Sequence, residues 1–518
     1  MSVSVIINSA ISPQQPSTPV KLRKIIPSVE QSSSKKILIL ATPSRRPNDI
    51  SKGDALSIQP FYGPKQRFPE GVATVLDHYT HGHPPPGEQH ENEALWHSRH
   101  VLVPYNLRDH SNNIFEGELR SLLYNIFPGT ENVTQARFRG YLIFQVKQLP
   151  SAPWPLTVGG LPITLSETRS NGRGRALMFP RATPGRLSIS ILQSGFDATN
   201  ISDKSLRQLA RHVNNYFQLN LPTVHIIELM FTCERTFFVV IDDHVELNTG
   251  SWPGKIANYP VAYLHDKDLN RPVWVDRPAK QEIEPQPSMG IVDDTAYDVL
   301  RPGVMISSSI ITGHSHPATL SSTAGVLVKN PAGDIFMTAA SRAIGNSEKI
   351  WQSRRPAETI GKAAVEISFT DICLVELDRS ISFSVQTFEA SDGVVPQFTR
   401  MATSGDEFNF STCYLNSPFT GLLDSEIIAK SIKIQAEGTP HPTEGRVRYV
   451  VYDWLYHGQE EANIQAELPG GICGSVIWND DGIVQGFYQF SIKEGPWKGF
   501  SACVSASEVV ESGYTLVT

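Results

Sequence analysis

LPGGICGSVIW, residues 468–478, places a cysteine between two glycines. Gly471 and Gly474 permit the tight turn that would expose the side chain of Cys473 at its apex. Such a turn also points consecutive backbone N–H groups at one spot, where they can stabilise an oxyanion. The motif therefore predicts a nucleophilic Cys473, with an oxyanion hole made by the N–H groups of Gly471 and Cys473. The alternative is a small buried apolar residue, which is the common environment of a free cysteine.

The C-terminal part of the chain, from about residue 300, predicts an all-β domain. Short runs rich in β-branched and aromatic residues follow one another between turn residues, as is typical of barrels and sandwiches. These runs are TAGVLVKN, GDIFMTAAS, TDICLVELD, RYVVYDWLY, GSVIWND, GIVQGFYQF and KGFSACVS. A terminal helix is expected in ASEVVES, capped by Ser505 or Ser507 and ended by Gly513.

Three of these motifs occur in the order found in peptidases of the trypsin/chymotrypsin fold, or PA clan, which residues 300–518 resemble. FMTAAS is similar to the strand end that presents the catalytic histidine, TDICLVEL to the strand that bears the catalytic aspartate, and GGICGSVIW to the nucleophile turn. More narrowly, these residues resemble uncharacterised fungal proteins with a trypsin-like cysteine/serine peptidase domain. The resemblance implies two six-stranded antiparallel β-barrels and a C-terminal helix. It also implies that Asp371 orients a histidine; the alternative is a solvent-facing start of a strand.

The histidine itself is missing, because FMTAAS ends in Ser341 and Arg342 follows. A serine hydroxyl is no base near neutral pH, and a guanidinium stays protonated, so neither can relay the nucleophile's proton to a leaving amine. His314, His316 and His457 lie elsewhere in the domain and could substitute only if the fold brought one of them to the site. Amide hydrolysis by the usual route is therefore expected to be lost or impaired.

Two further side chains are candidates for the site. Arg342 could turn inward and bind Asp371 with both arms of its guanidinium, or it could be a solvated surface arginine. Glu467 lies six residues before Cys473, where this fold often sets the floor of the specificity pocket. There it would favour a basic substrate side chain, but an exposed loop glutamate is the plainer interpretation.

The N-terminal half has a different pattern. Residues 1–94 are rich in Ser, Pro, Gln and Gly and are expected to form a largely disordered arm. Its histidines at 78, 81, 83 and 90 could bind a metal, although a solvated loop is favoured. Residues 95–280 predict an α+β domain, including a helix capped by Ser202 with a buried stripe. The proline-rich residues 281–299 predict a linker to the domain at 300–518.

Composition narrows the functional classes. A net charge of -7 gives no electrostatic reason to expect a nucleic-acid partner, and no apolar run is long enough for a membrane span. Five widely spaced cysteines favour a reducing compartment and predict an intracellular, cytoplasmic protein. No cofactor or metal is expected, and the oligomeric state is not indicated.

Three functions remain open from the sequence. The first is a pseudoprotease that binds a peptide or protein in the cleft between two barrels. The second is an active cysteine endopeptidase with a non-standard histidine. The third makes the N-terminal α+β domain the interaction module and the barrels its scaffold.

Overall fold

The structure is a computed structural model, and it is mostly β. It describes residues 23–24, 95–97, 99–103, 105, 107–108, 113–136, 140–150, 154–168, 179, 182–192, 196–197, 201–272, 293–310, 318–345, 349–388, 396–408, 410–436, 447–461, 464–465, 468 and 471–518. The expected disordered arm, its four histidines and most of the expected linker lie outside these residues.

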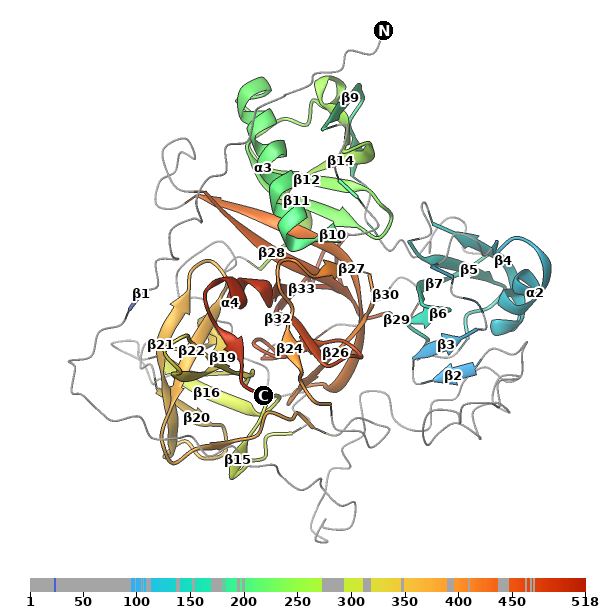
Figure 1. The fold of residues 1–518 in the computed structure, drawn as a ribbon. Coiled ribbons are helices and arrows are strands. Elements are labelled where there is room, and N and C mark those ends of the chain that lie inside the picture. The colour runs from blue at the N-terminus through green and yellow to red at the C-terminus, as the bar shows by residue number, and fades with distance from the viewer. Residues whose placement is uncertain are drawn as a thin grey trace.

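A nine-stranded sheet holds most of the chain between residues 305 and 377, together with the last strand (Figure 1). Its order is β17-β16-β20-β21-β22-β19-β18-β34, with β1 beside β21. Its strands are β1 (Arg23–Lys24), β16 (Met305–Ile310), β17 (Ala318–Thr323), β18 (Leu327–Lys329), β19 (Ile335–Ala340), β20 (Lys349–Gln352), β21 (Thr359–Ile367), β22 (Ile372–Leu377) and β34 (Thr515–Leu516).

A thirteen-stranded sheet runs from the C-terminal part of the chain back into the N-terminal half. Its order is β26-β31-β32-β33-β28-β27-β11-β12-β14-β13-β9, with β24 beside β32 and β8 beside β14. Its strands are β8 (Thr183–Pro184), β9 (Leu187–Ile191), β11 (Ile226–Thr232), β12 (Phe237–Ile241), β13 (Pro253–Ile256), β14 (Tyr259–His265), β24 (Arg400–Met401), β26 (Thr412–Ser417), β27 (Gly421–Ala436), β28 (Val447–Tyr456), β31 (Val476–Trp478), β32 (Ile483–Ser491) and β33 (Phe500–Ser505).

Six strands of this sheet pair in a closed cycle. β26 pairs with β31, and the path continues through β32, β33, β28 and β27 before β27 pairs with β26 again, every pair antiparallel. Closure leaves these strands without free edges within the cycle.

Each strand expected from the seven runs after residue 300 is present, so the prediction of an all-β C-terminal region is confirmed at the level of its strands.

The hairpin of β27 and β28 extends beyond this cycle and joins it to the N-terminal half. β11 pairs antiparallel with β27, Glu228 opposite Lys433, so one sheet crosses between the two regions that the sequence separates at 281–299. Helix α3 (Asp203–Asn220) covers the extension, and Ile432 and Val451 from the hairpin belong to the same apolar cluster as the helix.

Both sequence-predicted helices are present, with one error in capping. Ser202 caps α3 and receives a hydrogen bond from the N–H of Ser205, and the expected apolar stripe is fully buried. The terminal helix α4 (Ser507–Glu511) instead has Ala506 at its N-cap position, without a side-chain cap, so the cap by Ser505 or Ser507 was wrong. Both hydroxyls are used elsewhere, because they donate to the buried carboxylate of Asp203.

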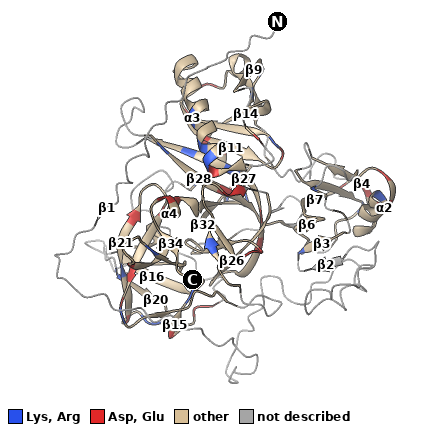
Figure 2. Cartoon of the chain, in the orientation of Figure 1, with Lys and Arg blue, Asp and Glu red and all other residues tan. Residues whose placement is uncertain are grey.

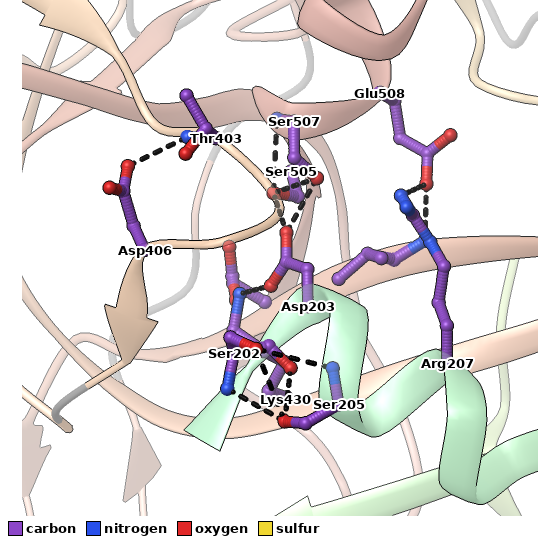
Figure 3. A network of polar contacts seen from close by, with 12 residues as sticks. Ser202, Asp203, Ser205, Arg207, Thr403, Asp406, Lys430, Ser505, Ser507 and Glu508 are labelled. Carbon is purple, nitrogen blue, oxygen red and sulfur yellow. Dashed lines mark hydrogen bonds and ion pairs between the residues drawn. The ribbon is translucent and has the colours of Figure 1, made fainter. Parts of the chain in front are cut away.

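A charged network binds α3 to the hairpin and to α4 (Figure 3). Lys430 Nζ lies 2.6 Å from carboxylate oxygens of both Asp203 and Asp453, and all three side chains are buried. One turn along the helix, Arg207 donates to Glu508 at 2.7 Å. Figure 2 shows basic and acidic residues of α3, β27 and β28 gathered at this junction. Each of these buried charges has an opposite charge beside it, which offsets part of the cost of burying it.

A six-stranded sheet with its own core docks on the side of the closed cycle that faces away from the nine-stranded sheet (Figure 1). Tyr456 Oη donates to Ile163 O at 3.1 Å, and Leu165 N donates to Gln459 Oε1 at 2.8 Å. Arg108 pairs with the buried Glu426 at 2.9 Å. The sheet is covered by α2 (Gly117–Ile126), and its strands are β2 (Leu95–His97), β3 (His100–Leu102), β4 (Thr130–Gln135), β5 (Leu142–Val146), β6 (Thr157–Val158) and β7 (Leu161–Glu167).

The remaining elements are short. Three two-stranded pairs join β10 (Ile201–Ser202) to β25 (Glu407–Phe408), β15 (Val299–Leu300) to β23 (Ser382–Phe383), and β29 (Gln459–Glu461) to β30 (Ile464–Gln465). The 3-10 turns are η2 (Thr249–Ser251), η3 (Asp266–Leu269) and η5 (Ser341–Ala343). In the described parts of the chain, no helix is long and apolar enough to cross a membrane.

Candidate functional site

The turn that carries Cys473 leads into β31, and its backbone needs both glycines. Gly471 and Gly474 have φ values of 93° and 85°, in the left-handed region that side chains other than glycine adopt at a cost. A Cβ at Gly474 would lie 2.8 Å from Thr323 O, and one at Gly471 would lie 2.4 Å from the ring of Phe419. The spacing of these glycines therefore sets the shape of the turn.

Hydrogen bonds hold the turn between the nine-stranded and the thirteen-stranded sheets. Thr323, the last residue of β17, donates its N–H to Cys473 O at 3.0 Å and its hydroxyl to Gly471 O at 3.2 Å. From β32, Tyr488 O accepts the N–H of Gly474 at 2.9 Å, and Tyr488 N donates to Ser475 O at the same distance. Both sheets thus fix the position of Cys473.

Cys473 differs from the other four cysteines in its accessibility. It is half-buried, whereas Cys233, Cys373, Cys413 and Cys503 are buried, and all five are free thiols. Burial raises the pKa of the Cys233, Cys413 and Cys503 thiols well above its usual range. The thiol at the glycine turn is therefore the one that solvent and reagents can reach.

Arg342 turns inward and binds Asp371. Its side chain pairs with the carboxylate of Asp371, and its own backbone N–H donates to Asp371 Oδ1 at 2.8 Å. The other arm of the guanidinium donates to the backbone carbonyl of Gln489 in β32. The side chain of Arg342 is 14% exposed and that of Asp371 is 20% exposed, which does not fit a solvated surface arginine.

Asp371 is held by its backbone as well as by its side chain. Its φ is 56°, at the turn just before β22, and its carbonyl accepts the N–H of Ser341 at 2.8 Å. Ser341 is buried and opens the 3-10 turn η5 that carries Arg342. The segment that follows β19 and the segment that precedes β22 are therefore locked together without an imidazole.

Gln489 and Tyr488 are the site residues that sequence reasoning missed. The buried amide of Gln489 donates to Thr370 O at 2.5 Å, next to Asp371. Asp371, Gly474, Tyr488 and Gln489 line one cavity of about 10 Å³, room for roughly one water molecule. Both residues lie in β32, the second strand after the turn that carries Cys473, and this position was the only signal in the sequence. Gln489 contacts Arg342 through its backbone, which no side-chain pattern reveals.

His457 is fully buried, and neither of its ring nitrogens is directed to Cys473. Nδ1 is 2.6 Å from Ser425 Oγ, and Nε2 is 2.9 Å from Ser501 Oγ. Burial, reinforced by the positive charge of Arg99, lowers the pKa of His457 to about 3. The imidazole is therefore neutral, weakly basic and committed to two serine hydroxyls.

The remaining candidates lie outside the described residues. These are His314 and His316, the alternative bases, and Glu467, the expected floor of the specificity pocket. Of the residues that the structure does describe, no three of His, Cys, Asp and Glu are placed to hold a metal ion.

Comparison with solved structures finds proteases among the matching chains. No family model and no curated protein matches the chain. A glutamic acid specific serine protease is 14% identical, with 42% of this chain and 100% of that chain covered at a TM-score of 0.28. The Nocardiopsis protease is 13% identical over 42% of this chain and 99% of its own, at a TM-score of 0.26. An inactivated protease paralogue from the scabies mite is 9% identical, with 40% of this chain and 90% of that chain covered at a TM-score of 0.20. Similarity at this level assigns no role to any residue.

Proposed function

We propose that residues 300–518 form a two-barrel, chymotrypsin-like protease fold with a degenerate triad, and that the protein binds a peptide or protein without hydrolysing it. The observation that carries the proposal is the contact of Arg342 with Asp371. In a working triad, the carboxylate orients an imidazole that takes the nucleophile's proton and later gives it to the leaving amine. Here a permanently charged guanidinium occupies that carboxylate, so no group at this position can relay the proton.

The alternative of an active endopeptidase needs another base. His457 is the described candidate, and its geometry is unfavourable because Ser425 and Ser501 occupy both ring nitrogens. A pKa of about 3 also makes it a poor base at neutral pH, since efficient general bases have pKa values near the operating pH. Proton relay by a positioned base is worth roughly 10² to 10⁴ in rate, so its loss removes most amide turnover.

The third hypothesis gives the function to the N-terminal α+β region alone. The pairing of β11 with β27 argues against a separable module, because residues 201–269 complete their sheet with a strand from beyond residue 420. Three expectations from the sequence stay predictions. They are a linker at residues 281–299, a role of Glu467 in substrate specificity, and an intracellular location.

The test is a digest of a broad peptide library by the full chain, analysed by mass spectrometry beside the Cys473→Ala variant. We expect identical product profiles for the two proteins. Cleavage that disappears in Cys473→Ala would contradict the proposal.

Binding is tested by panning a displayed random peptide library on Cys473→Ala and on Cys473→Trp, whose bulk obstructs the site. Peptides retained by the first variant and lost by the second support a ligand at the turn, and equal retention places binding elsewhere.

A further inference from the structure

We infer that Cys473 takes acyl groups from thioesters and keeps them as a stable adduct. The inference rests on the proposed function, and it names the substrate class that the same site can still process. A nucleophile turn without a proton relay loses only those reactions whose leaving group must be protonated. The question is therefore which acyl compounds release a group that needs no proton.

Leaving-group chemistry separates thioesters from amides. An amine leaves a tetrahedral intermediate only when it is protonated, which is the acid step that the missing imidazole would perform. A thiol has a pKa near 8.5, so it leaves as a thiolate near neutral pH. Transfer of an acyl group from a thioester to a thiol also changes the free energy little, because one carbon–sulfur bond replaces another. A thioester thus bypasses the step that Arg342 blocks.

The proposed step balances without a co-reactant. The Cys473 thiolate attacks the acyl carbon, a new carbon–sulfur bond forms, and the bond to the original thiol breaks. The electron pair leaves on the departing sulfur, which takes a proton from water, while the proton of Cys473 has gone to solvent. Nothing is oxidised or reduced.

The turn supplies donors for the oxyanion of this step. The N–H groups of Gly474 and Ser475 are used internally, by Tyr488 O at 2.9 Å and Ile472 O at 3.1 Å. Among the described residues, the N–H groups of Gly471 and Cys473 have no acceptor, so both stay available to a ligand. Hydrogen-bond donors of this kind are worth about 10² to 10³ in rate each. They act equally on an amide and a thioester carbonyl, so the leaving group decides the outcome.

The second half of a peptidase cycle fails at this site. Hydrolysis of the acyl group needs a base that activates water, and Arg342 is both cationic and committed to Asp371 and Gln489. Water is therefore a poor acceptor, and the acyl group stays on Cys473 until another thiolate arrives. The expected behaviour is one acyl group per chain and no steady turnover.

The experiment uses the full chain and the N-acetylcysteamine thioester of phenylacetic acid, with acylation followed by intact mass and peptide mapping. The matched control is Ser380→Cys in a Cys473→Ala background, which places a thiol at an exposed turn. Each rate is divided by the thiolate fraction obtained from the pH dependence of iodoacetamide labelling. We expect Cys473 to acylate at least tenfold faster per thiolate than the control, to stop at one acyl group, and to leave the corresponding phenylacetyl amide untouched.

Equal rates per thiolate would overturn the inference, and so would rapid hydrolysis of the adduct with continuing turnover. The peptide digest keeps this result separate from the proposed function. Cleavage of peptides would defeat the proposed function whatever the acylation rate. A silent digest with equal acylation rates would defeat the present inference alone.

Discussion

In the proposed function, Arg342 holds the site together through Asp371 but supplies no base. Its backbone N–H and guanidinium satisfy the carboxylate of Asp371, and its second arm reaches Gln489 across the junction between the two sheets. An imidazole offers fewer donors, but it can give up its proton and take it back. Arg342 therefore offers Asp371 a fixed charge, whereas an imidazole at this position would offer a proton that can be transferred.

The first prediction is that Arg342→His restores peptide cleavage. The imidazole would stand between Asp371 and the turn and could act as the general base, so we expect a gain of about 10² or more in cleavage rate over the unmodified chain. The rate is measured by mass spectrometry on the same peptide library. Arg342→Lys is the control, because it keeps the charge and supplies no base. Equal products from the His and Lys variants would contradict the prediction.

At the site, local sequence could predict identities but not all contacts. The glycines around Cys473 and the place of Asp371 follow from motifs, and the inward arginine was one of two alternatives because a single side chain can point either way. The role of Gln489 could not be predicted, since its backbone carbonyl is an acceptor that any residue would supply.

At the scale of elements, the long hairpin of β27 and β28 is the piece that unites two hydrophobic cores. Lys430, in the middle of β27, lies between the buried carboxylates of Asp203 and Asp453. Asp203 also accepts hydrogen bonds from Ser505 and Ser507. Burial raises the pKa of Asp453, Lys430 lowers it and the charge of Asp203 raises it, with a net pKa of about 6. One ammonium thus serves two carboxylates, of which Asp203 is the better satisfied.

The second prediction concerns Lys430→Met. Loss of the ammonium leaves two carboxylates buried beside each other without a cation, which costs about 3–5 kcal/mol of the free energy of unfolding for a broken buried pair. Chemical denaturation followed by tryptophan fluorescence measures the change. Lys362→Met is the control, because Lys362 is exposed and its pair with Glu376 is 3.7 Å long. A loss no larger than that of the control would show that the network contributes little.

The individual strands of this region were predictable, whereas their partners were not. Runs that alternate apolar and polar residues or are rich in β-branched residues identify β11, β12 and the strands after residue 300. Such patterns can be recognised because strand formation depends on residues that are neighbours in sequence. The pairing of β11 with β27 joins segments far apart in sequence, and nothing local in either segment encodes it. The same holds for β34, which returns to the nine-stranded sheet after the chain has completed the other one.

At the scale of the whole molecule, the six-stranded sheet contributes a side chain that lies against the closed cycle. Gly458 leaves room for Arg99, which comes from the six-stranded sheet, because a Cβ there would lie 2.2 Å from the guanidinium. Arg99 in turn lowers the pKa of the adjacent His457, after the larger effect of burial. The protonation of His457 therefore depends on the docked N-terminal sheet.

The third prediction is that His457 makes the stability of the whole chain depend on pH. The unfolded chain binds a proton at this residue below its ordinary pKa of 6.5, whereas the folded protein binds it only below about 3. Stability is therefore fully present above pH 6.5 and falls as the pH is lowered towards 3, by at most about 1.4 kcal/mol per pH unit.

The measurement is the free energy of unfolding against pH for the unmodified chain and for His457→Gln, whose amide can still hydrogen-bond to both serines. Asp453 acts in the opposite direction between about pH 4 and 6, and its contribution cancels when the two curves are subtracted. The variant should lose less stability on acidification. A difference curve that stays flat from pH 7 to 4 would contradict the prediction.

The sheet shared by β11 and β27 has a consequence for synthesis on the ribosome. β11 ends at Thr232, and its partner strand β27 begins at Gly421. At common elongation rates, the ribosome needs about 10 to 40 s to translate the residues between them. Throughout that interval the nascent chain exposes an open edge that invites pairing with other polypeptides. A chaperone that shields this edge would therefore raise the yield of native protein, and it would act before the turn that carries Cys473 has been translated.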